Sequence, residues 1–207
     1  MKTIITALVF ALAATASHAL ADVAPDALAR SVTDEVLAIV RADKDLQAGN
    51  PQKVAQLVET KVLPHFSFTR MTQLAVGKNW RQASPDQQRV LTEEFKTLLV
   101  RTYTTAFTQY KNQTIDIKPL RMSPSDTDVI VKSAIRQPTG QPIAVDYSME
   151  KAGQTWKVYD VKIEGISLVE NYRNTFNGEI QRGGVDGLIR TLSNKNKALA
   201  AQWAQRS

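Results

Sequence analysis

The spacing of apolar residues changes twice along the chain, and this feature constrains the fold more than any other. Up to about residue 110, apolar side chains recur at intervals of three and four, the period of an amphipathic α-helix. From 114 to 163 they recur at every second position, the period of a strand with one buried face. After Gly165 the helical spacing returns. Helices followed by consecutive strands and further helices predict an α+β domain.

The central part of the chain contains four runs with the strand period. These runs cover 114–120, 127–137, 142–150 and 155–163. Their short links, Pro138–Gln141 and the turn at Gly153, predict an antiparallel meander with one buried face. We therefore expect a curved, four-stranded antiparallel sheet that ends at Gly165, with helices packed over its apolar face.

The helices on both sides of these strands are delimited by clear start and stop signals. The first is expected over 27–47, and Gly49, Asn50 and Pro51 separate it from a short second helix. A third is expected over 66–76 and a long fourth one from Ser84 to about 110, opened by a capping box. After the sheet, helices are expected over 167–181 and 185–203, with a break at Gly183 and Gly184.

The first 21 residues have the three parts of a secretory signal peptide. Lys2 supplies the basic start, 4–14 are apolar, and Ala19-Leu20-Ala21 forms a small-residue cleavage site. The apolar run is about half of the roughly 20 residues that a membrane span needs. We therefore predict cleavage after Ala21, export to the periplasm, and a mature chain, 22–207, that forms one soluble domain.

The composition restricts the partners of such an exported chain. It contains 26 Lys and Arg against 20 Asp and Glu, a net charge of +6, and no cysteine. The basic excess suits an anionic lipid head group or membrane surface, and export argues against nucleic acid. Without cysteine the domain has no disulfide and no lipidated N-terminus, so its stability must come from core burial.

Few residues offer catalytic or metal-binding chemistry. Apart from His18, His65 is the only histidine, and the sequence has no nucleophile elbow, zinc motif or phosphate-binding glycine loop. Asp126 and Asp128 fit a turn leading into a strand better than a cation site. Asp160 and Glu164 are the best acid pair, although a role in joining the sheet to a helix is the stronger interpretation. We expect no enzyme activity, no metal and no cofactor.

Aliphatic and aromatic side chains are far more abundant than catalytic ones, and the strand and helix periods place them on inward faces. Periodicity alone favours an ordinary filled core but does not distinguish it from the wall of a cavity. The candidate wall residues are Phe95, Leu99, Tyr103, Phe107, Val129, Val131, Ile135, Ile143, Val145, Tyr147, Met149, Val158 and Ile166.

Five sequence segments, in order, resemble those of one family. They are 62–66 (VLPHF), 77–88 (GKNWRQASPDQQ), the aromatic positions Phe95 and Tyr103, 156–168 (WKVYDVKIEGISL) and 184–188 (GVDGL). Together they resemble the MlaC family, also called the toluene-tolerance auxiliary family, over nearly all of the mature chain.

The resemblance implies a fold and a function. It implies an NTF2-like α+β cup and a periplasmic carrier that takes phospholipid between an outer-membrane lipoprotein–porin complex and an inner-membrane ABC transporter. Acyl chains would enter the apolar space between sheet and helices, and the carrier would be a monomer with only transient membrane contact. The alternative is a periplasmic adaptor or chaperone with an NTF2-like fold, whose interior is filled and whose partner is a protein.

Overall fold

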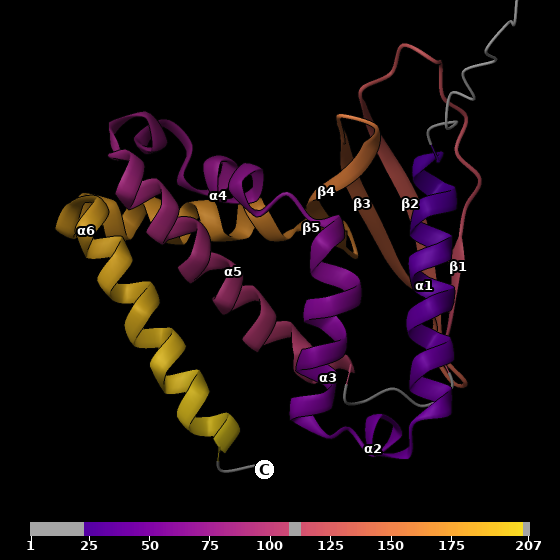
Figure 1. Ribbon diagram of the computed structural model, residues 1–207. Coiled ribbons are helices and arrows are strands. Elements are labelled where there is room, and N and C mark those ends of the chain that lie inside the picture. Colours follow the sequence, from indigo (N-terminus) through magenta and orange to yellow (C-terminus); the bar gives the residue numbers. More distant parts are fainter. Residues whose placement is uncertain (1–22, 108–112, 205–207) are drawn as a thin grey trace, which may run out of the picture.

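A computed structural model describes residues 23–107 and 113–204, and it shows helices on both sides of a single antiparallel sheet (Figure 1). The helical elements are α1 (Pro25–Ala42), α2 (Lys44–Gln47), α3 (Pro51–Leu57), η1 (Val58–Val62), η2 (Leu63–His65), α4 (Phe68–Val76), η3 (Gly77–Gln82), α5 (Pro85–Phe107) and α6 (Leu168–Ala204). The strands are β1 (Thr114–Ile117), β2 (Asp128–Arg136), β3 (Ile143–Ala152), β4 (Thr155–Ile163) and β5 (Ile166–Ser167). The α+β class is therefore confirmed.

The sheet has five strands in the order β1-β2-β3-β4-β5, not four as predicted. The four expected strands are all present, and each pairs antiparallel with the next. The fifth forms because the chain does not leave the sheet at Gly165. Glu164 and Gly165 have positive φ values of 50° and 80°, and they turn the chain back so that Ile166 pairs with Ile163.

The start signals of the helices are confirmed in atomic detail. The Ser84 Oγ accepts from the Gln87 amide, and the Gln87 side chain accepts from the Ser84 amide, which is the reciprocal capping box at the start of α5. Asn50 caps α3 by accepting from the Lys53 amide. The first predicted helix differs, because it is divided at Asp43, whose carboxylate accepts from the Asp45 and Leu46 amides and starts α2.

The helix α6 contains the predicted break. Gly184 has φ 67° and ψ −170°, which is not helical, and the second half of α6 turns back beside α5 (Figure 1). Helices α4, α5 and α6 enclose one packed core, which we call the helical core. Its buried members include Met71, Leu91, Phe95, Leu98, Phe176 and Leu188, each at most 2% exposed.

A second core lies between the sheet and α1. The helix begins beside the end of β1, because the Asp26 carboxylate accepts from the Leu120 amide and Arg30 donates to the Ile117 carbonyl, 2.6 Å away. From there α1 runs in front of the sheet (Figure 1). Its residues Leu28 and Ala29 pack on the apolar sheet face, which is therefore covered by α1 at this end.

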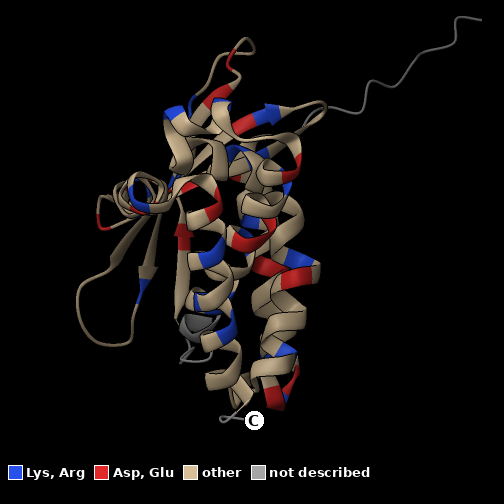
Figure 2. Ribbon diagram, turned by 90° about the vertical axis from the view of Figure 1, so that its left-hand side faces the viewer, with Lys and Arg blue, Asp and Glu red and all other residues tan. Residues whose placement is uncertain are grey.

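The predicted signal peptide, 1–21, lies outside the described residues. Within 23–107 and 113–204, no helix is long and apolar enough to cross a membrane. Lys, Arg, Asp and Glu are interspersed along the helices in the view of Figure 2. The helices therefore present charges of both signs to water on this side.

Candidate functional site

The strand register places every predicted wall residue of the sheet on one face. Opposite residues in neighbouring strands point to the same side, so the pairing defines rows across the sheet. The rows are Val129–Met149–Val158, Val131–Tyr147–Val161, Ile117–Ser133–Val145–Ile163–Ile166, and Ile115–Ile135–Ile143. This inner face runs from the row of Met149 at one end to the row of Ile143 at the other.

The inner face is filled with protein at the Met149 end. Val131 and Met149 are 0% and 1% exposed, and Val129 and Val158 are also buried. They form one cluster with Ile117 and Trp156, and Leu28, Ala29 and Phe66 pack against this cluster. These wall candidates therefore lie in a closed core between the sheet and α1.

The opposite end of the inner face is less completely covered. Ile135, Ile143 and Ile163 are only partly buried, and among the described residues they belong to none of the three buried apolar clusters. Val145 is buried within the sheet but is also outside those clusters. We call this region, the β2, β3 and β4 parts of the rows that contain Ile143 and Val145, the open end of the sheet. The β1 members of these rows, Ile115 and Ile117, belong to the filled side.

Tyr147 marks the boundary between the filled and open ends. Burial raises the pKa of its hydroxyl, which forms a hydrogen bond with Ser133. Ser133 in turn donates to the Val145 carbonyl, 2.7 Å away. The Tyr147 side chain nevertheless keeps some exposed surface. Tyr147 also packs against the filled cluster, so it lies between the closed core and the more accessible residues of the neighbouring rows.

The candidate residues of α5 separate into two groups. Phe95 and Leu99 are 0% and 6% exposed and belong to the helical core, where the Phe95 ring meets the Tyr172 and Phe176 rings edge-on at 5.0 Å. The structure therefore packs Phe95 against α6 and not toward the sheet, because α6 supplies the aromatic partners that the helical period alone does not reveal.

Tyr103 and Phe107 lie one and two turns further along α5. Tyr103 is half-buried, its hydroxyl forms a hydrogen bond with that of Tyr172, and burial raises its pKa. Phe107 is the last residue of α5, and its side chain lies outside the described residues. Tyr103 packs against the edge of the helical core, and of the α5 candidates with a described side chain it is the one that is only partly buried.

Ile166 lies on the inner-face row of Val145, at the edge strand β5. It is 64% exposed, so it extends this row to the surface of the molecule. This row is therefore apolar from Val145 in β3 to Ile166 at the sheet edge.

A third apolar cluster contributes residues that the sequence pattern did not single out. Val36, Leu46, Val54, Leu57 and Val58 join α1, α2 and α3 into this cluster. Val40, Val62 and Leu63 are partly buried against it. The helix α1 begins beside Leu120, and its second half carries this cluster away from that end of the sheet (Figure 1). The sequence signal for these residues is the helical spacing of apolar side chains over 27–47 and in the short second helix, which marks them as core without showing what they pack against.

The candidate acidic residues have structural partners. Asp160 is buried and accepts from Ser167 Oγ at 2.6 Å and from the Val169 amide at 3.1 Å, which fixes the start of α6. Glu164 accepts instead from the Ala144 amide, Asp126 from the Ser123 amide, and Asp128 from the Tyr159 hydroxyl. Among the residues that the structure describes, no group of three His, Cys, Asp or Glu could hold a metal ion.

His65 lies at the junction of the two cores. It ends η2, and burial together with the nearby Lys157 cation lowers the pKa of its imidazole. The next residue, Phe66, packs against both the helical core and the sheet core. The surroundings of His65 are therefore those of a structural junction.

Together these features define an α+β domain whose antiparallel sheet is covered by a helix at one end of its apolar face and open at the other. A family model described as MlaC protein matches residues 30–194. The chain therefore belongs to the MlaC family, as the sequence segments indicated.

Relatives of known sequence and structure agree with this assignment. The chain is 25% identical to the intermembrane phospholipid transport system binding protein MlaC of Haemophilus influenzae, over 83% of this chain and 81% of that protein. It is 27% identical to the toluene tolerance protein ttg2D of Pseudomonas putida, over 78% and 75% of the two chains. A phospholipid-binding protein from Ralstonia solanacearum, solved in complex with a phospholipid, is 45% identical, with a TM-score of 0.78 over 84% of this chain and 98% of that one.

Proposed function

We propose that this protein is a periplasmic phospholipid carrier. The observation that carries the proposal is the match to the Ralstonia solanacearum protein, which is 45% identical, shares the fold, and was solved with a phospholipid bound. The open end of the sheet in this chain supplies the apolar surface that such a ligand needs. In this proposal the acyl chains lie against the rows of Ile143 and Val145, beside Tyr103 and with Tyr147 at the inner limit.

The energetics favour an apolar region as the holder of such a ligand. Each buried methylene stabilises the complex by about 0.8 kcal/mol, so a 16-carbon acyl chain contributes on the order of 12 kcal/mol before ordering costs are subtracted. Aliphatic walls provide this stabilisation without specific hydrogen bonds. We therefore expect loose selectivity for the acyl chains and slow release unless a partner opens the site.

The proposal extends to the place of this carrier in the cell. The carrier, a monomer freed by cleavage after Ala21, takes phospholipid between an outer-membrane lipoprotein–porin complex and an inner-membrane ABC transporter, and touches the membranes only transiently. The relative from Haemophilus influenzae is described as the binding protein of an intermembrane phospholipid transport system, which supports a role for this carrier between two membranes. The protein has no catalytic step in this account.

The proposal is tested by purifying the full chain from the periplasm without detergent. Native mass spectrometry should show a mature protein that begins at Asp22 and carries the added mass of a phospholipid, which organic extraction then identifies. Protein that is exported and folded but carries no lipid would contradict the carrier and favour the adaptor with a protein partner. A transfer assay between vesicles, with and without the two membrane complexes, would then test the shuttle itself.

A further inference from the structure

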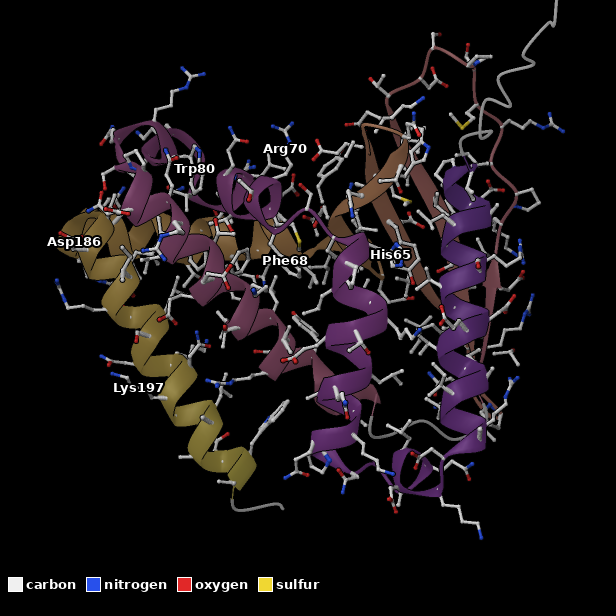
Figure 3. All side chains as sticks on the ribbon, viewed as in Figure 1. His65, Phe68, Arg70, Trp80, Asp186 and Lys197 are labelled. Atoms are coloured by element: carbon white, nitrogen blue, oxygen red, sulfur yellow. The ribbon has the colours of Figure 1, made fainter. Side chains whose placement is uncertain are left out.

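A cleft unrelated to the open end of the sheet lies on the other side of the helical core. It has a volume of about 590 Å³ and is formed by α4, η3 and the first half of α6. Figure 3 shows Arg70 and Trp80, which come from α4 and η3, at the top of the helical part of the molecule. Four cationic side chains, Arg70, Lys78, Arg81 and Arg173, line the cleft together with Leu74 and Trp80, and no carboxylate is among its lining residues.

Two hydrogen bonds tie the walls of this cleft together, and one of them holds Arg173 in place. The Arg173 Nε donates to the Leu74 carbonyl at 2.9 Å, which fixes an arginine of α6 across the cleft from α4. The Asn79 side chain donates to the Asn177 side chain at 3.3 Å and ties η3 to α6. These bonds connect α4 and η3, which form one wall of the cleft, to α6, which forms the other.

Arg70 is only partly neutralised by its neighbours. Its guanidinium lies 5.8 Å from the centre of the Tyr159 ring, and its Nε is 3.6 Å from a Glu150 carboxylate oxygen. That separation is too long for a hydrogen bond, and the buried Nε has no hydrogen-bond partner. One carboxylate at this distance leaves a clear positive excess in a cleft lined by four cations.

We infer that this cleft is a docking site for an acidic segment of a partner protein, with Arg70, Arg81 and Arg173 receiving its carboxylates. Arginine forks bind carboxylates through paired hydrogen bonds, and such contacts are shorter and stronger than neutral ones. Trp80 and Leu74 add an apolar surface for the neighbouring side chains of the segment. Arg70 and Arg173 are partly buried in the cleft, and a side chain of the segment can reach them there.

The shape of the cleft distinguishes a protein segment from a membrane surface. A lipid bilayer is flat on this scale, so it would meet the exposed Lys78 and Arg81 at the rim but not the half-buried Arg173 within. An extended acidic segment can enter a concave space of this volume. This docking site is independent of the proposed lipid site, which faces the sheet, so either can be correct without the other.

The test uses the full mature protein and a synthetic peptide in which Glu and Leu alternate over twelve positions. Binding is followed by ¹⁵N chemical-shift mapping, and the same peptide with Gln in place of Glu serves as the uncharged probe. We expect the acidic peptide to shift the signals of Gly77, Lys78 and the Trp80 indole, and to bind less tightly at higher salt. The Gln peptide should leave these three signals unchanged.

Charge reversals then locate the site. Arg81→Glu and Lys78→Glu should each weaken binding of the acidic peptide about tenfold. The control is Lys197→Glu, which makes the same change in net charge at an exposed position on the far half of α6 (Figure 3) and should change binding less than about twofold. Circular dichroism and the amount of co-purified lipid should be the same in all three variants.

Three results would overturn the inference. The first is an acidic peptide that does not bind, and the second is an equal loss for Arg81→Glu and Lys197→Glu, which would show attraction by net charge alone. The third is binding to phosphatidylglycerol vesicles, but not to the peptide, that Arg81→Glu abolishes, since this would make the cleft a membrane contact. None of these results would affect the presence or absence of bound phospholipid.

Discussion

Two apolar regions of this molecule are built from similar residues but differ in how they are covered. In the helical core, Phe95, Leu98 and Phe176 are at most 2% exposed and contact one another across α5 and α6. At the open end of the sheet, Ile135, Ile143 and Ile163 remain partly exposed and belong to no buried cluster among the described residues. The first region stabilises the fold, and in our proposal the second is completed by an acyl chain.

The largest expected effect is the loss of the Phe95 ring from the helical core. Phe95→Ala should lower the free energy of unfolding by about 3–5 kcal/mol, because removal of a fully buried aromatic ring leaves a cavity. The measurement is urea unfolding of lipid-free protein, since bound lipid would add its own stabilisation.

The amount of lipid per folded molecule should not change in Phe95→Ala. A stability loss below about 1 kcal/mol, together with loss of bound lipid, would instead show that Phe95 is part of the lipid site. That result would remove the distinction between the two regions.

The next effect concerns Asp160, which connects the sheet to the helical core. Asp160→Asn should cost about 1.5–3 kcal/mol of unfolding free energy, because the buried carboxylate accepts from both Ser167 and the Val169 amide. The matched control is Glu164→Gln, whose amide can still accept from Ala144, and we expect a change below about 0.5 kcal/mol.

Lipid binding should survive in both acidic variants, as measured by native mass spectrometry. Equal stability of Asp160→Asn and wild type would mean that the start of α6 is held by other contacts. Any substrate turnover that both variants lose would support the enzyme interpretation of this acid pair.

The smallest expected effect is at His65, beside the residue that packs against both cores. Its pKa is lowered by burial and by Lys157, so below pH about 6.5 the unfolded chain binds a proton that the folded chain resists. The stability of the wild type should therefore fall, as the pH is lowered from about 7 to 5, by up to about 1 kcal/mol more than that of His65→Gln.

The pH series of urea unfolding curves for the two proteins provides this comparison, because titration of the carboxylates is common to both. Parallel pH dependence would show that His65 titrates alike in the folded and unfolded states. In that case the protonation of His65 would make no contribution to the pH dependence of stability.

Much of this architecture follows from local sequence signals. The strand periods predicted four of the five strands, and the inner-face assignment of Val129, Val131 and Met149 is confirmed by the register. The capping box at Ser84 and the helix break at Gly184 are also found at the predicted residues. These signals succeed because each depends on a few neighbouring residues.

The features that were not predicted depend on contacts between distant segments. A register shift beside Ser148 places Tyr159 as an extra residue in β4, and Ser148 and its partner Asp160 are both buried on the outer face. The orientation of Phe95 depends on aromatic partners in α6, about 80 residues later. Whether an apolar face is filled or open depends on which helix covers it, and the period of that face is the same in either case.

The central claim is that the apolar sheet face is open at the row of Ile143 and filled at the row of Val131. The most direct test places the same bulky side chain in both regions and measures lipid occupancy by native mass spectrometry, with thermal unfolding of lipid-free protein in parallel. Ile143→Trp should fold with nearly wild-type stability and lose most of its bound phospholipid, whereas Val131→Trp should be destabilised by about 1–3 kcal/mol or more because its surroundings are already packed. Full lipid occupancy in Ile143→Trp, or destabilisation as large as that of Val131→Trp, would contradict the account.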